Sequence, residues 1–183
     1  MSLVAKQGSN EDFVQPKTGL TTAIVQSVID CGTQPDDKFG PKRKIMIVLA
    51  LPKQTHIFEE GEAPEMLTIS KWFTLSTHKK GNLKPFVEGI TGQVLTGDYD
   101  VTELLGINCM AHLVEHIKDN GDKKVVIAST SPLMDGQEPI AIKTSKFSFD
   151  DFDLAEFQAL SERMQERLKV TPEYKAQIAD NPY

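Results

Sequence analysis

The sequence predicts a mainly β protein with a short helix between its third and fourth strands and an amphipathic helix near its C-terminal end. Three observations predict this class: polar and apolar residues alternate in several segments, turn-forming residues separate those segments, and apolar residues recur at helical spacing in two places. The chain has 183 residues, 39% of them hydrophobic and 25% charged, which is ordinary for a globular domain. This composition excludes a disordered chain, a collagen-like chain and a disulfide scaffold.

The first two strands are expected on either side of a turn-rich loop. Residues 1–19 are polar and are expected to form a flexible arm. Apolar and polar residues alternate over residues 20–31, which predicts the first strand. The loop GTQPDDKFGPKRK follows, with two prolines and two glycines. Residues 45–51 are apolar on both faces and predict a second strand, which Pro52 is expected to end.

A third strand and then a helix are expected next. Residues 66–75 alternate and predict the strand. The helix is indicated by four apolar residues at helical spacing, namely Leu83, Phe86, Val87 and Ile90. We expect Ser76 or Thr77 to cap this helix, Pro85 to lie in its first turn, and Gly89 and Gly92 to end it. One more helical turn is expected over residues 100–106, capped by Asp100 or Thr102.

The last two strands are expected to form a hairpin. Residues 107–118 and 124–131 have strand patterns, and the segment DNGDKK between them is a strong hairpin signal. The resulting order is three strands, a helix and two strands. The OB-fold, a small five-stranded Greek-key barrel, has this order, with its helix between the third and fourth strands. We therefore expect an OB-fold domain over residues 20–140.

Residues 141–183 are expected to form an acidic segment followed by an amphipathic helix. The chain carries a net charge of −6, of which −4 falls in residues 147–183, with four Lys or Arg and eight Asp or Glu. Five apolar residues repeat along one face of the expected helix, namely Leu154, Phe157, Leu160, Met164 and Leu168. This region either packs back on the barrel or contacts a partner protein, and the sequence leaves both open. The candidate partner-contact residues are Asp150, Asp151, Phe152, Asp153 and Phe157.

The sequence favours a cytoplasmic protein with no membrane partner. Its longest apolar run is far shorter than the ~20 residues that cross a bilayer. Its N-terminus is polar and acidic where a signal peptide needs an apolar core. Cys31 and Cys109 are far apart in the chain and lie in expected strands, so we expect reduced, buried thiols.

Three groups of basic residues stand out in this acidic chain. The first lies around the loop between the first two strands and comprises Lys38, Lys42, Arg43 and Lys44, with Phe39 among them. The second lies in residues 71–87, which contain no acid, and comprises Lys71, Lys79, Lys80 and Lys84. The third flanks the last hairpin and comprises Lys118, Lys123 and Lys124. In an OB-fold these segments surround one groove, where positive charge would neutralise the phosphates of single-stranded nucleic acid.

Trp72 is the most informative single residue of the sequence. Alternation along the third strand puts it with Thr68, Ser70 and Thr74, on the face opposite the apolar residues. An exposed tryptophan there suits base stacking, and Phe39 is a second candidate for stacking. The alternative is that the Trp72 ring packs under the N-terminal arm or the C-terminal helix.

Neither an enzyme nor a cofactor is expected. The sequence lacks GxxxxGK[ST], GxGxxG after a strand, HExxH and GxSxG. His112 and His116 lie on an expected strand without other ligands at a known metal-binding spacing, so no metal site is expected.

Three motifs carry a resemblance to a known family. The segments ISKWFTLSTHKKGNL, DVTELLGINCMAHLVEH and SPLMDG followed by EP resemble small proteins encoded in replication modules of tailed bacteriophages and prophages. The resemblance covers about residues 66–140. Some of these proteins resemble OB-fold single-stranded DNA-binding proteins.

The resemblance implies a sequence-independent single-stranded DNA-binding protein in the bacterial cytoplasm. It would protect exposed strands during replication or recombination. The acidic segment would compete with DNA for the groove or recruit a phage or host replication protein. The alternative is an OB-like interaction module that acts on a phage or host replication protein.

Overall fold

The fold is built on a sheet of six strands, seen in a computed structural model that describes residues 14–180. Most of the arm expected over residues 1–19 lies outside the described residues. The strands are β1 (Gly19–Gln34), β2 (Lys42–His56), β3 (Glu65–Thr74), β4 (Asn108–Ile117), β5 (Lys123–Pro132) and β6 (Ser145–Phe147). The sheet order is β3-β2-β1-β4-β5 with antiparallel neighbours, and the short β6 runs parallel to β1. The prediction of a mainly β protein is confirmed.

All five strands expected from the sequence are present, and two of them run further than expected. β1 continues past Cys31 to Gln34. β2 continues through Pro52 to His56, so the expectation that Pro52 ends the strand is wrong. The pairing of β2 with β3 shifts register between Leu51 and Thr55, and this irregularity accommodates a proline that has no N–H to donate. The hairpin expected at DNGDKK joins β4 to β5.

The expected helix between β3 and β4 is α1 (Leu83–Thr91), and a 3₁₀ turn, η1 (Val101–Leu104), follows it. α1 begins after Asn82, so Ser76 and Thr77 lie too far upstream to cap it and that expectation is wrong. Gly92 ends the helix in the left-handed conformation, with φ 68°, and Gly89 lies inside it. Asp100 caps η1 as expected, because its carboxylate accepts a hydrogen bond from the Thr102 amide (3.0 Å).

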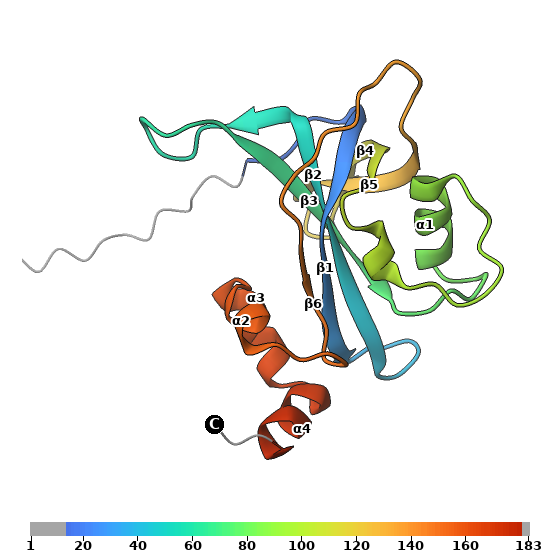
Figure 1. Ribbon diagram of the computed structural model, residues 1–183, viewed down its shortest axis with the longest axis vertical. Helices are drawn as coiled ribbons and strands as arrows, with labels where there is room; N and C mark the ends of the chain where they lie inside the picture. Colours follow the sequence, from blue (N-terminus) through green and yellow to red (C-terminus); the bar gives the residue numbers. More distant parts are fainter. Residues whose placement is uncertain (1–13, 181–183) are drawn as a thin grey trace, which may run out of the picture.

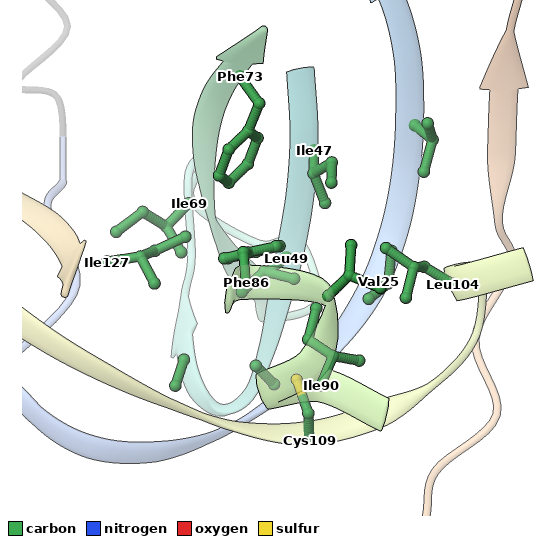
Figure 2. Close-up of a cluster of buried hydrophobic side chains, with 14 of the residues drawn as sticks. Val25, Ile47, Leu49, Ile69, Phe73, Phe86, Ile90, Leu104, Cys109 and Ile127 are labelled. Carbon is green, nitrogen blue, oxygen red and sulfur yellow. The ribbon is translucent and has the colours of Figure 1, made fainter. Parts of the chain in front are cut away.

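The main core lies between the curved sheet and α1. Figure 2 shows side chains from the strands, α1 and η1 pointing into one shared volume, including Ile47, Leu49, Phe73, Phe86 and Leu104. The Phe73 and Phe86 rings pack with their centroids 4.6 Å apart. These contacts fix α1 against the sheet and bring β3 close to β5.

The sheet is open between β3 and β5. Over residues 14–180 no backbone ladder joins these two strands. A side chain spans the gap instead, because the Lys71 ammonium donates a hydrogen bond to the Ile127 carbonyl oxygen (3.1 Å). Burial lowers the pKa of Lys71, in keeping with an ammonium that faces the core side of β3.

Residues 148–180, which we call the C-terminal segment, pack on the opposite side of β1 and β2 from α1. It contains α2 (Leu154–Gln158), α3 (Glu162–Lys169) and α4 (Pro172–Asp180), which Figure 1 shows on the far side of the long strands from α1. A second apolar cluster joins it to β1, and we call this the outer core: Ile29, Cys31, Phe147, Phe149, Phe157 and Leu168. Packing back on the sheet is therefore the outcome that the structure shows.

The single helix expected over residues 154–168 is wrong, because two helices form there. The carboxylate of Asp153 caps α2 by accepting from the Glu156 amide (3.0 Å). The hydroxyl of Ser161 begins a new helix, α3, by accepting from the Met164 amide (3.3 Å). After this second start, Phe157 of α2 and Leu168 of α3 both lie in the outer core.

The two cysteines belong to different cores. Cys31 lies in the outer core, beneath the C-terminal segment, whereas Cys109 lies in the main core. Both are free and buried, as expected. Burial raises the pKa of each thiol to about 12, so both stay protonated in the folded protein near neutral pH.

Substitution of Gly89 by alanine should destabilise the protein by about 1–3 kcal/mol, although alanine normally favours a helix. A Cβ at this position would clash with the hydroxyl and carbonyl oxygens of Thr130 on β5. The measurement is urea unfolding followed by circular dichroism. Gly97→Ala is the matched control, because a Cβ there meets nothing within 4 Å. Equal stability of the two variants would contradict the close packing of α1 on β5.

Candidate functional site

Trp72 lies on the outer face of β3, as its position in the strand predicts. It pairs across the sheet with Met46 of β2. α3 lies over this part of the sheet, and the guanidinium carbon of Arg167 is 5.0 Å from the centroid of the Trp72 ring. The ring is therefore half-buried between the sheet and the C-terminal segment.

Two cavities are lined by the pair formed by Trp72 and Arg167. One, of about 230 Å³, is lined by Gln34, Pro35, Lys44, Trp72, Phe73 and Arg167. The other, of about 320 Å³, is lined by Met46, Trp72, Lys124, Ser161, Arg163, Met164 and Arg167. Because Trp72 and Arg167 line both, the two cavities form one interrupted groove, which we call the Trp72 groove.

Every charged residue that lines the Trp72 groove is basic. These residues are Lys44 from β2, Lys124 from β5, and Arg163 and Arg167 from α3. Lys44 is held in place by Asp36 (3.0 Å) and by the Thr74 hydroxyl (2.8 Å). Within residues 14–180, the other three make no ion pair at 4.0 Å or less. The groove is therefore locally positive in a chain whose net charge is −6.

Of the DNA-contact residues expected from the sequence, Lys44, Trp72 and Lys124 line this groove. Lys38, Phe39 and Lys42 lie exposed at the turn between β1 and β2, where the Lys38 ammonium sits 5.1 Å from the Phe39 ring centroid. Lys79 and Lys80 are exposed in the loop before α1. All five lie outside the lining of the two cavities.

The remaining expected residues are engaged elsewhere. Lys84 pairs with Glu88 on α1 (3.7 Å), and Lys123 pairs with Glu115 across the hairpin (3.3 Å). Lys71 bonds to Ile127 on the core side of the sheet. Arg43 is bound to carboxylates beneath the C-terminal segment.

Arg163 and Arg167 were missed by the sequence analysis. They lie in a region identified by its acids and by its apolar helix face. The signal that could have found them is their spacing, because residues four apart share one face of a helix. Only the docking of α3 over β3 turns that face toward Trp72.

Asp30 anchors the C-terminal segment to β1 and β2. The residue is 5% exposed, and its carboxylate accepts hydrogen bonds from the amides of Gly32 (2.9 Å) and Phe149 (3.0 Å). It also forms an ion pair with Arg43, whose guanidinium reaches Asp150 as well (3.0 Å). A buried carboxylate needs such donors, so the three segments are held together at this point.

α4 is anchored to the end of β1 by Glu173. Its carboxylate accepts hydrogen bonds from the amide (2.9 Å) and the hydroxyl of Thr33. Burial raises the pKa of Glu173, but the two bonds from Thr33, a bond from its own backbone amide and the nearby Arg43 charge together leave that pKa below its ordinary value. Gly32, with φ 63°, lets the strand approach the Glu173 carboxylate closely.

Most of the residues expected to contact a partner protein make contacts within the protein instead. Phe157 is buried, and Phe152 packs on the Phe147 and Phe149 rings. Asp153 caps α2 and Asp150 pairs with Arg43. Asp151 is exposed.

Comparison of the chain with protein-family models and with curated proteins finds no match. Over residues 14–180 no three His, Cys, Asp or Glu side chains gather in a way that could hold a metal ion. In the same part of the chain no helix has the length and apolar character needed to cross a membrane.

Asp30→Asn should lower the free energy of unfolding by about 2–3 kcal/mol. The asparagine side chain has no negative charge to pair with Arg43, and its NH2 group would face the N–H donors that now bind the carboxylate. Asp150→Asn is the control, since the side chain of Asp150 is 76% exposed and its pair with Arg43 should contribute less than about 1 kcal/mol. Chemical unfolding of both variants measures the difference. A loss no larger for Asp30→Asn than for Asp150→Asn would refute the anchoring role.

Proposed function

We propose that this protein is an OB-fold protein that binds single-stranded DNA without sequence preference through the Trp72 groove. The observation that carries the proposal is the composition of the groove, in which an aromatic ring lies among four basic residues and no acidic residue lines either cavity. Single-strand binding without sequence preference uses such a groove, with cations for the phosphates and an aromatic ring for the bases.

The order of the strands supports the OB-fold part of the proposal. An OB-fold has its helix between the third and fourth strands and binds its ligand over strands two and three. Here α1 follows β3, the sheet order is β3-β2-β1-β4-β5, and Trp72 lies on β3 opposite Met46 of β2. The contact between Lys71 and Ile127 brings the two ends of this order together.

The proposed biological setting comes from the resemblance to replication-module proteins of tailed bacteriophages and prophages. On this proposal the protein coats exposed single strands during replication or recombination in the bacterial cytoplasm. The proposal needs no catalytic residue and no cofactor.

A second candidate function is that of an interaction module for a replication protein, and one observation favours it. The loop between β2 and β3 exposes Ile57 (51%) and Phe58 (56%) next to Glu59, Glu60 and Glu62. Figure 1 shows this loop projecting from the body of the protein. An apolar tip flanked by acids would suit a partner with an apolar pocket rimmed by basic residues.

The full chain should bind fluorescently labelled oligo-dT, with an affinity that falls as salt rises from about 50 to about 200 mM. Trp72→Ala should weaken this binding by about 1–3 kcal/mol, because the stacking surface is lost. Trp72→Phe, which keeps a ring, should lose less. Fluorescence anisotropy measures the binding, and thermal melting verifies that each variant is folded.

Phe58→Ala is the matched control, because it removes an aromatic residue that is 56% exposed but outside the groove. It should leave DNA affinity unchanged. If folded Trp72 variants bound DNA as tightly as the unmodified protein, the Trp72 groove would not be the DNA-binding site. If the unmodified protein showed no salt-dependent binding, the second candidate would be favoured.

A further inference from the structure

We infer that α3 is one wall of the DNA-binding groove and that Arg163 and Arg167 contact the phosphates of the bound strand. The inference rests on the proposed function and reverses the role that its acidic composition suggested for the C-terminal segment. The segment contributes positive charge to the site instead of competing with DNA for it.

The first argument is the direction in which the charges of the segment face. None of its acids in the described residues lines either cavity. Three of them have partners elsewhere, because Asp150 pairs with Arg43, Asp153 caps α2, and Glu173 accepts from Thr33. Its two groove-facing charges are Arg163 and Arg167. A strand in the groove would therefore meet cations on both walls, with Lys44 and Lys124 on the sheet side.

The second argument is the position of Arg167 on Trp72. The guanidinium carbon lies over the ring, 5.0 Å from its centroid. It therefore covers the ring face on which a base would stack. Trp72 and Arg167 line both cavities, so this pair borders both parts of the groove. Movement of this one side chain would join the two cavities into a continuous path along Trp72.

The third argument is that displacing Arg167 costs little. Within the described residues it makes no ion pair, so the cation–π contact with Trp72 is the interaction that a base must replace. An exposed cation–π contact corresponds to a preference of about 2- to 5-fold, whereas stacking of a base corresponds to about 5- to 150-fold. The base therefore takes the Trp72 face, and the displaced guanidinium is left beside the sugar-phosphate chain.

The test is the salt dependence of oligo-dT binding by the full chain with single substitutions. Loss of one phosphate contact on a single strand lowers the slope of log affinity against log salt by about 0.7. Arg163→Gln should show this change, which corresponds to affinity about 8-fold weaker at 50 mM salt and about 3-fold weaker at 200 mM. Arg167→Gln should show the same change in slope with a smaller loss of affinity, because it also uncovers Trp72.

Lys175→Gln is the matched control, since it removes one positive charge from α4 of the same segment, outside the groove. Its slope should equal that of the unmodified protein. Trp72, the sole tryptophan, gives a second readout, because Arg167→Gln should change its fluorescence in the free protein and Arg163→Gln should not.

Two results would overturn the inference while leaving the proposed function in place. One is salt-dependent binding by the unmodified protein with both arginine variants matching Lys175→Gln. The other is tighter binding by Arg167→Gln together with an unchanged slope, which would mean that α3 only blocks the groove. Absence of binding by the unmodified protein would instead reject the proposed function itself.

Discussion

The buried carboxylate of Asp30 is the constraint on which the outer side of this protein depends. It lies on β1, and its donors come from the bulge at Gly32, from Arg43 of β2 and from Phe149 of the C-terminal segment. Burying a charge is costly unless such donors pair with it, so the contacts of Asp30 hold these segments together. The outer core then covers β1, so that α3 extends over the neighbouring face at Met46 and Trp72. The groove exists because the segment is fixed in this place.

This arrangement separates the charges of an acidic chain. Acids of the C-terminal segment serve as ion-pair partners, helix caps and anchors, as Asp150, Asp153 and Glu173 illustrate. Arg163 and Arg167 of the same segment line the groove at Trp72 and have no carboxylate partner among the described residues. The net charge of −6 therefore gives no guide to the local potential at the groove. Polyanion binding by an acidic protein requires such a separation.

Local patterns predict the strands of this fold well, because period-two alternation and turn residues act within a few positions of each other. These local patterns predicted the five long strands, α1 and the Asp100 cap. β6 and the break between α2 and α3 were not predicted, because each depends on the docking of distant segments. The covering of Trp72 by the C-terminal region was one of two alternatives that the sequence left open, and local patterns could not decide between them. The site was predicted in part for the same reason: Lys44, Trp72 and Lys124 line the groove, whereas Arg163 and Arg167 were missed. The side of Lys71 was predictable, since it alternates with Ile69 and Phe73 of the core.

The most direct test asks whether the C-terminal segment stays on the sheet when DNA binds, and it uses the two buried thiols. Cys31 lies under the C-terminal segment and Cys109 lies under α1, so their alkylation rates report on the outer core and the main core separately. Peptide mass spectrometry after iodoacetamide treatment near pH 8 measures both rates, with and without oligo-dT at a concentration that anisotropy has shown to be saturating. If the segment stays docked when DNA binds, both thiols remain slow to react in either condition. Rapid labelling of Cys31 with DNA bound, while Cys109 stays slow, would mean that the segment leaves the sheet and would contradict this structure of the site.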